Sequence, residues 1–140
     1  MTRLPKDTVR FEAPATANRC GRATLGLLLH GSDAGNGVMI WLRPGDSLVR
    51  GELSLLPRAD SVATRGATVT VRFLLGEVTH GATLDSGAVV VTRAEGPVTL
   101  RARGSGVDVG AGGSAGRVGL DASFESVPVG PDTVTCTVRR

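Results

Sequence analysis

The chain has 140 residues and a formal net charge of +3; hydrophobic side chains make up 41% of it, and aromatic side chains only 3%. A chain of this length forms one domain, whose core must be built mainly from valine, leucine and alanine. Arginines and acids are interspersed and aromatics are scarce, which argues against a nucleic-acid partner. No apolar run approaches the roughly 18 residues of a membrane-spanning helix, so we expect no transmembrane segment.

The first 19 residues are polar and contain two prolines. We expect an N-terminal arm over residues 1–19, extended only at residues 8–12, and a single domain over residues 20–140. The arm contributes three cations as candidate partner contacts: Arg3, Lys6 and Arg10. Its beginning contains no apolar stretch of the kind found in secretory signal peptides.

Apolar and polar side chains alternate with a period of two along most of the remaining chain, as in strands with one buried face. This pattern predicts strands at residues 22–30, 38–42, 48–56, 67–73, 117–125 and 133–139, with a looser extended stretch at 76–83. Residues rich in glycine, proline and polar side chains predict loops or bends at 31–37, 43–46, 104–116 and 127–132.

The clearest hairpin covers residues 86–103, where two runs of β-forming residues flank Ala94-Glu95-Gly96-Pro97. Its second arm places Val98, Leu100 and Ala102 on one face, opposite Thr99, Arg101 and Arg103. Frequent turns and the lack of helical periodicity predict an all-β protein, an antiparallel β-sandwich of about eight to ten short strands. A partly closed β-barrel is the alternative.

Two cysteines, Cys20 and Cys136, lie near opposite ends of the chain, and each stands in a strand-like run. We predict that the terminal strands lie side by side and that a disulfide joins them, with two buried free thiols as the alternative. Because disulfides persist in oxidising compartments, we expect an extracytoplasmic protein, periplasmic or secreted.

Residues 82–88 read Ala-Thr-Leu-Asp-Ser-Gly-Ala. The motif resembles the catalytic turn of the retroviral-type aspartic proteases, in which an apolar strand leads into Asp-Ser/Thr-Gly-Ala. The resemblance implies a small β-protein whose homodimer brings two such aspartates together, with Asp85 as the catalytic acid. A hairpin turn explains the same residues, because aspartate and serine bond to local backbone N–H groups and glycine accepts positive φ.

Other catalytic or metal-binding arrangements find little support. A Ser-His-Asp triad would have to use His30, Ser32 and Asp33, or else His80 with the aspartate of the motif above, and no Gly-x-Ser-x-Gly turn is present. Asp33 and Asn36 offer oxygen ligands to Ca²⁺, although turn chemistry explains both. We therefore predict no enzymatic activity, no metal and no cofactor.

The polar face of the hairpin and its neighbours is the best candidate for binding a partner. It comprises Arg72, Thr99, Arg101, Arg103 and Arg117. Such a surface can pair with acidic groups of another protein or with the phosphates of anionic lipid head groups. A solvated face that keeps sheets from aggregating is the alternative.

Together these observations predict a non-enzymatic structural or interaction protein. We expect an extracytoplasmic, membrane-extrinsic accessory subunit of a larger bacterial complex, comparable by analogy to extrinsic subunits of respiratory or photosynthetic complexes. Three alternatives stay open: a β-sandwich that binds a small ligand or carbohydrate, an aspartic protease that uses Asp85, and a phage or capsid decoration protein. Scarce aromatics disfavour the carbohydrate site.

Overall fold

Ten strands and no helix make up the described part of the chain. The computed structural model describes residues 12–20, 26–44, 50–56, 65–75, 77–109, 116–134 and 136. The strands are β1 (Ala15–Cys20), β2 (Leu27–Asp33), β3 (Asn36–Pro44), β4 (Gly51–Ser54), β5 (Arg65–Leu75), β6 (Val78–Thr83), β7 (Ser86–Arg93), β8 (Val98–Val107), β9 (Arg117–Val127) and β10 (Val129–Val134). The described residues contain no helix with the length and apolar character needed to cross a membrane.

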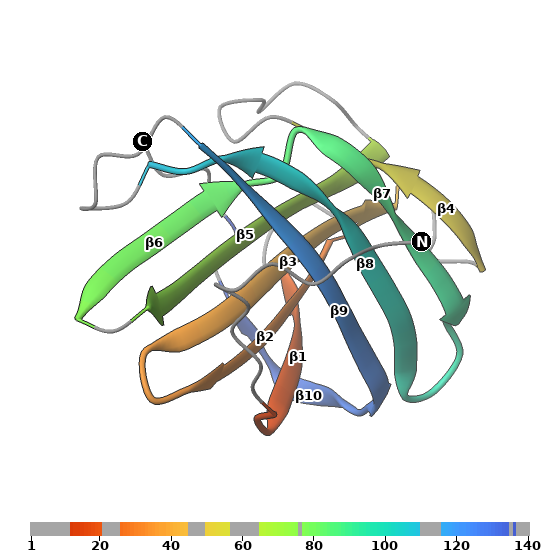
Figure 1. Cartoon of the computed structure of the whole chain (residues 1–140). Helices are drawn as coiled ribbons and strands as arrows, with labels where there is room; N and C mark the ends of the chain where they lie inside the picture. Colours follow the sequence, from red (N-terminus) through yellow and green to blue (C-terminus); the bar gives the residue numbers. More distant parts are fainter. Residues whose placement is uncertain are drawn as a thin grey trace.

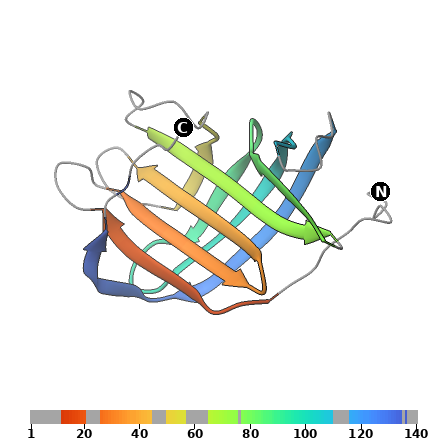
Figure 2. The ribbon, with the colours of Figure 1, turned by 90° about the vertical axis from the view of Figure 1, so that its left-hand side faces the viewer.

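The strands form two sheets that pack face to face, which confirms the predicted β-sandwich (Figure 1). One sheet has six strands in the order β10-β1-β2-β3-β5-β6, and the other has four in the order β4-β7-β8-β9. Figure 2 shows the strands of one sheet running across those of the other. Neighbouring strands within each sheet are antiparallel except β1 and β10, which are parallel.

The core lies between the sheets and consists mainly of small and medium aliphatic side chains. Every second residue of the strands points inward, as the alternation predicts. The largest fully buried side chains are Leu29, Ile40, Leu42, Leu84, Leu100, Val69, Val89, Val91 and Val98. Phe124 of β9 is the one aromatic residue in the buried cluster of the described chain. Such a core buries less area per side chain than an aromatic one, so covalent and backbone constraints matter more.

The hairpin predicted at residues 86–103 is present as β7 and β8. Its register pairs Ala88 with Arg103 and Val89 with Ala102. The inward face of β8 is the predicted one, because Leu100 and Ala102 are buried whereas Arg103 is exposed.

One predicted loop is a tight hairpin instead, and the first residues of another belong to a strand. The loop expected at 31–37 is a tight hairpin in which β2 and β3 are joined by Ala34 and Gly35, both with positive φ (51° and 88°). Such φ values match the right-handed twist of the flanking strands. In the glycine-rich loop expected at 104–116, residues 104–107 instead continue β8 and pair with β9. In both places, glycine permits close backbone packing rather than flexibility.

The ends of the chain also differ from expectation. Residues 15–19 of the expected arm belong to β1, and the segment at 8–12 lies outside the described residues except for Glu12. The bend expected at 127–132 is shorter, because β10 already begins at Val129. The last strand expected at 133–139 therefore overlaps β10 only at its start. The predicted disulfide joins Cys20 to Cys136 and ties β1 to the chain just after β10.

Backbone contacts join the two sheets at the corner where β6 turns into β7. The amide of Asp85 donates to the carbonyl of Ser105 (2.9 Å), and the amide of Val109 donates to the carbonyl of Gly81 (2.8 Å). Gly106 makes this contact possible, because a Cβ atom there would lie 2.2 Å from the carbonyl oxygen of Thr83. On the opposite side, the amide of Leu56 donates to the carbonyl of Ala67 (2.7 Å).

Replacing Gly106 with alanine should therefore force the two sheets apart at this corner. We expect Gly106→Ala to lower the free energy of unfolding by about 1–3 kcal/mol, as overpacked core substitutions do. Gly119→Ala is the matched control on the neighbouring strand, because the nearest atom to its added Cβ lies 4.0 Å away. Urea unfolding of both variants checks this; equal stabilities would show that the contact at Gly106 is unimportant.

Candidate partner-binding surface

The predicted surface residues fall on both sheets. Thr99, Arg101 and Arg103 lie on β8 and Arg117 lies on β9, so the four-stranded sheet brings these residues together. Arg72 is exposed on β5 of the six-stranded sheet and does not belong to this surface. The three cations expected in the arm, Arg3, Lys6 and Arg10, lie outside the described residues.

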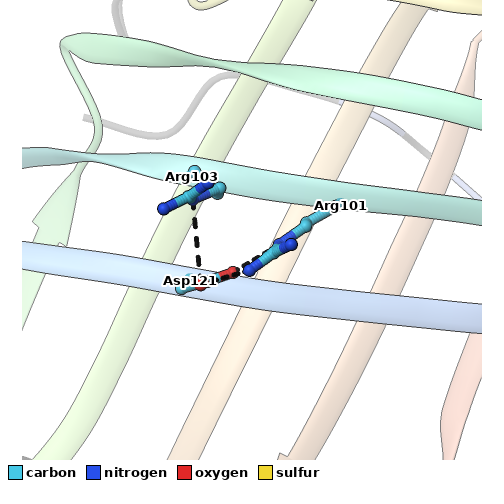
Figure 3. A network of polar contacts seen from close by, with 3 residues as sticks. All are labelled: Arg101, Arg103 and Asp121. Carbon is cyan, nitrogen blue, oxygen red and sulfur yellow. Dashed lines mark hydrogen bonds and ion pairs between the residues drawn. The ribbon is translucent and has the colours of Figure 1, made fainter. Parts of the chain in front are cut away.

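Two arginines of β8 converge on one aspartate of β9 (Figure 3). Nε of Arg101 donates to Oδ1 of Asp121 (2.8 Å), and Nη2 of Arg101 donates to Oδ2 (2.6 Å). Nε of Arg103 lies 3.7 Å from the same Oδ2. The three side chains are 52%, 64% and 49% exposed for Arg101, Arg103 and Asp121. We call these three residues the arginine cluster.

The register of β8 and β9 explains why Arg101 contacts Asp121 more closely than Arg103 does. Arg103 stands directly opposite Asp121, whereas Arg101 stands opposite Ser123 and reaches Asp121 diagonally. The diagonal contact allows the planar guanidinium to bind both carboxylate oxygens, which is the stronger geometry. The hydrogen bonds from Arg101 lower the pKa of Asp121, and Asp121 in turn raises the pKa of Arg101.

The other two predicted residues of this sheet are engaged in internal contacts. Arg117 pairs with the carboxylate of Asp85 and donates to Oγ of Ser105 (3.1 Å). Oγ1 of Thr99 accepts the amide of Ser126 (2.9 Å), which holds the end of β9 against β8. Of the predicted set on the four-stranded sheet, Arg103 is therefore the residue with the weakest partner within the chain and the most exposed side chain.

The three residues Asp85-Ser86-Gly87 at the centre of the protease-like motif have structural roles in the fold. Asp85 is half-exposed and ion-paired with Arg117, and Ser86 begins β7. Gly87 has a φ of 127°, and a Cβ atom there would lie 2.0 Å from the carbonyl oxygen of Arg103. Glycine is thus required because β7 and β8 approach closely at this point. The resemblance to the protease turn is confined to residues that form the entry to this hairpin.

A partly buried histidine–aspartate pair, which the sequence does not indicate, lies between the sheets. Nδ1 of His80 on β6 lies 2.5 Å from Oδ2 of Asp108, just after β8, and these side chains are 17% and 6% exposed. Oδ1 of Asp108 accepts the amide of Gly81 (3.3 Å), and the ring of Phe73 stacks on His80 at 5.2 Å. In sequence terms, Asp85 was only one conceivable partner of His80 in an unsupported triad. The strand ends that meet in the fold select Asp108 instead.

The residues considered for other chemistry have structural partners or neighbours. Asn36, a candidate Ca²⁺ ligand, accepts the amide of Leu74 through its Oδ1 (3.0 Å). Asp33 faces Asn36 across the β2–β3 turn, and His30 faces Met39 across the same hairpin. Among the residues that the structure describes, no three histidine, cysteine, aspartate or glutamate side chains gather as a metal site would require.

The outer face of the six-stranded sheet differs from that of the four-stranded sheet. Arg43 is buried on it, where its guanidinium lies 4.0 Å from the ring centre of Trp41 and donates to Thr68 (3.3 Å). Met39 is 44% exposed on the same face. Arg72 provides an exposed charge there, and it makes a useful reference for the arginine cluster.

Comparisons with protein-family models, curated proteins and solved structures found no match to the chain.

The lowered pKa of Asp121 gives a direct test of the arginine cluster. We expect the Asp121 carboxyl to titrate below the ordinary aspartate value of about 3.9, and Arg101→Gln to raise the midpoint toward that value. Arg103→Gln should raise it less, because its contact is longer. The pair stabilises the fold above the unfolded-state pKa, and this contribution is lost as pH falls through the lowered value. Carboxyl-detected NMR measures the midpoint; an unchanged midpoint in Arg101→Gln contradicts the assignment.

Proposed function

We propose that this chain is a non-catalytic interaction domain that works outside the cytoplasm, as an accessory subunit of a larger bacterial membrane-associated assembly. The outer face of the four-stranded sheet contacts the partner. The main support for the proposal is that the side chain of Arg103 is exposed and only weakly paired. Its guanidinium is 64% exposed, and its ion pair reaches only a carboxylate that Arg101 already binds at two oxygens.

The charges of the arginine cluster support this role. Two guanidinium groups around one carboxylate leave a local charge of +1, and Asp121 holds Arg101 in place beside Arg103. An arginine fork binds a carboxylate or phosphate through two parallel hydrogen bonds, and a pre-positioned fork loses little freedom on binding. The cluster therefore suits a partner that presents an acidic side chain to this face.

A protein partner fits this face better than a lipid surface. Glu52 of β4 and Glu125 of β9 alternate with buried neighbours and so point outward from the same sheet. Membrane surfaces attract groups of cations, and acids among those cations weaken the attraction. The positive charge of this face is thus confined to the arginine cluster. A single acidic side chain on a partner protein fits so small a site better than a lipid surface does.

The extracytoplasmic location is supported by the disulfide between Cys20 and Cys136. It closes a loop of most of the chain, for which the chain-entropy model gives roughly 4–5 kcal/mol. Proteins keep disulfides of this kind in oxidising compartments, since cytosolic thiols are held reduced. The role as an accessory subunit rests on the exposed and incompletely paired Arg103 of the arginine cluster.

Charge reversal tests the proposed surface. The oxidised protein is immobilised and used to recover proteins from detergent extracts of bacterial membranes, identified by mass spectrometry. We expect Arg103→Glu to weaken recovery about tenfold, equivalent to ~1.4 kcal/mol. Arg72→Glu makes the same charge change at an exposed position of the other sheet and should leave recovery unchanged.

Two results would contradict the proposal. Equal loss in both variants would indicate a non-specific charge effect, and a wild-type chain that recovers nothing would remove the subunit role. Vesicles containing anionic lipid provide a separate measurement. Binding to them that depends on Arg103 would assign the surface to lipid rather than to protein.

A further inference from the structure

The indole of Trp41 lies beside the disulfide between Cys20 and Cys136. A Cβ atom built on Gly26 would lie 2.8 Å from Sγ of Cys20 and 3.0 Å from Nε1 of Trp41. Both atoms are therefore within 3.0 Å of one point, and they are separated by no more than twice that distance. Because residue 26 is glycine, it places no side chain between the indole and the disulfide.

The pairing of β1, β2 and β3 brings these groups together. The amide of Cys20 donates to the carbonyl of Gly26 (2.9 Å), and the next residue, Leu27, pairs with Leu42 of β3. Leu42 is buried in the core, so its neighbour Trp41 points to the outer face of the six-stranded sheet. The indole and the disulfide thus meet where the ends of three neighbouring strands lie side by side.

The indole N–H group has an unusual environment. Nε1 of Trp41 is buried and has no hydrogen-bond partner among the residues that the structure describes. Buried donors of this kind are rare, because leaving one unmatched costs free energy. The guanidinium of Arg43 lies over the same ring, 4.0 Å from its centre. A positive charge in this place favours loss of the Nε1 proton once the ring has given up an electron, and the sulfur of Cys20 is close enough to receive that proton.

We propose that Trp41 makes the Cys20–Cys136 bond sensitive to near-ultraviolet light. The excited indole transfers one electron to the disulfide, which gives an indole radical cation and a disulfide radical anion. The Nε1 proton moves to sulfur, and the S–S bond breaks. One cysteine is then a thiol, the other is a thiyl radical, and Trp41 is a neutral indolyl radical, so electrons and protons balance within the chain.

A two-electron hydrogen donor such as ascorbate completes the reaction. It gives one hydrogen atom to the thiyl radical and one to the indolyl radical, and it becomes dehydroascorbate. Trp41 is restored, and the net change is reduction of the disulfide to two thiols. Without such a donor, return of the hydrogen atom to the indolyl radical allows the S–S bond to form again. Light and a donor together therefore release the covalent tie between β1 and the chain after β10.

Illumination of the oxidised protein tests the proposal. The protein is exposed, with ascorbate and without oxygen, to light at the long-wavelength edge of tryptophan absorption, where disulfides absorb little. Thiols are then labelled with a maleimide and located by mass spectrometry. We expect the label on Cys20 and Cys136 to increase with exposure, whereas a sample kept in the dark with ascorbate retains its disulfide. Labelling no greater than in the dark sample would overturn the proposal.

Two variants separate the contact from general photodamage. Trp41→Phe keeps an aromatic ring that does not absorb this light, so labelling should fall to the level of the dark sample. Trp41→Phe combined with Met39→Trp restores the indole at an exposed position on the same face of β3, displaced by about 7 Å along the strand. This variant absorbs the same light and should also stay near the dark level. Equal labelling of this variant and the unaltered chain would contradict a role for the contact.

The fluorescence of the unaltered chain gives a readout that needs no substitution. Electron transfer to the disulfide competes with emission, so Trp41, the only tryptophan, should be quenched in the oxidised protein. Reduction with dithiothreitol should raise its emission severalfold while near-ultraviolet circular dichroism shows the chain to be folded. An unchanged emission would contradict the proposal. Arg103→Glu should respond to light like the unaltered chain, so this result is separate from that of the proposed partner surface.

Discussion

The disulfide between Cys20 and Cys136 is the constraint on which the arrangement of the six-stranded sheet depends. The sheet ends at β10, whose pairing with β1 is parallel and irregular and whose side chains bury little surface. A core of valine, leucine and alanine has limited capacity to hold such an edge strand through packing alone. The covalent bond supplies what packing does not, because it restricts the unfolded chain over most of its length.

On the charged outer face of the four-stranded sheet, most arginines are paired with acidic residues of the same chain. Arg117 is matched by Asp85, and Arg101 is matched by Asp121. Arg103 shares a carboxylate that is already occupied, and this incomplete pairing makes it the group best suited to meet an acid on another molecule. The pair formed by His80 and Asp108 lies between the sheets and joins β6 to the end of β8, so it helps to hold the two sheets together.

Sequence alone predicted the fold class, the hairpin of β7 and β8 and the disulfide, because each depends on local alternation or on residues of a single type. Alternation shows which side chains share a face of one strand, but it does not show which sheet the strand joins. Arg72 was therefore grouped with Arg101 although the two lie on different sheets. The glycines near residue 104 indicated a loop, yet Gly104 allows β8 to pass close to β7 and Gly106 allows it to pass close to the end of β6. The pairing of His80 with Asp108 required knowing which strand ends meet, and that information is present only in the folded chain.

The unfolding free energy of the oxidised and reduced protein tests the central role of the disulfide most directly. Trp41 is the only tryptophan and lies on β3, so its fluorescence follows unfolding in urea without a label. Reduction, or replacement of both cysteines by serine, should lower the unfolding free energy by about 3–5 kcal/mol. Hydrogen exchange at β1 should accelerate at the same time, because its partner strand is released. A loss below about 1 kcal/mol with unchanged exchange at β1 would show that packing alone holds β10 and would contradict this account.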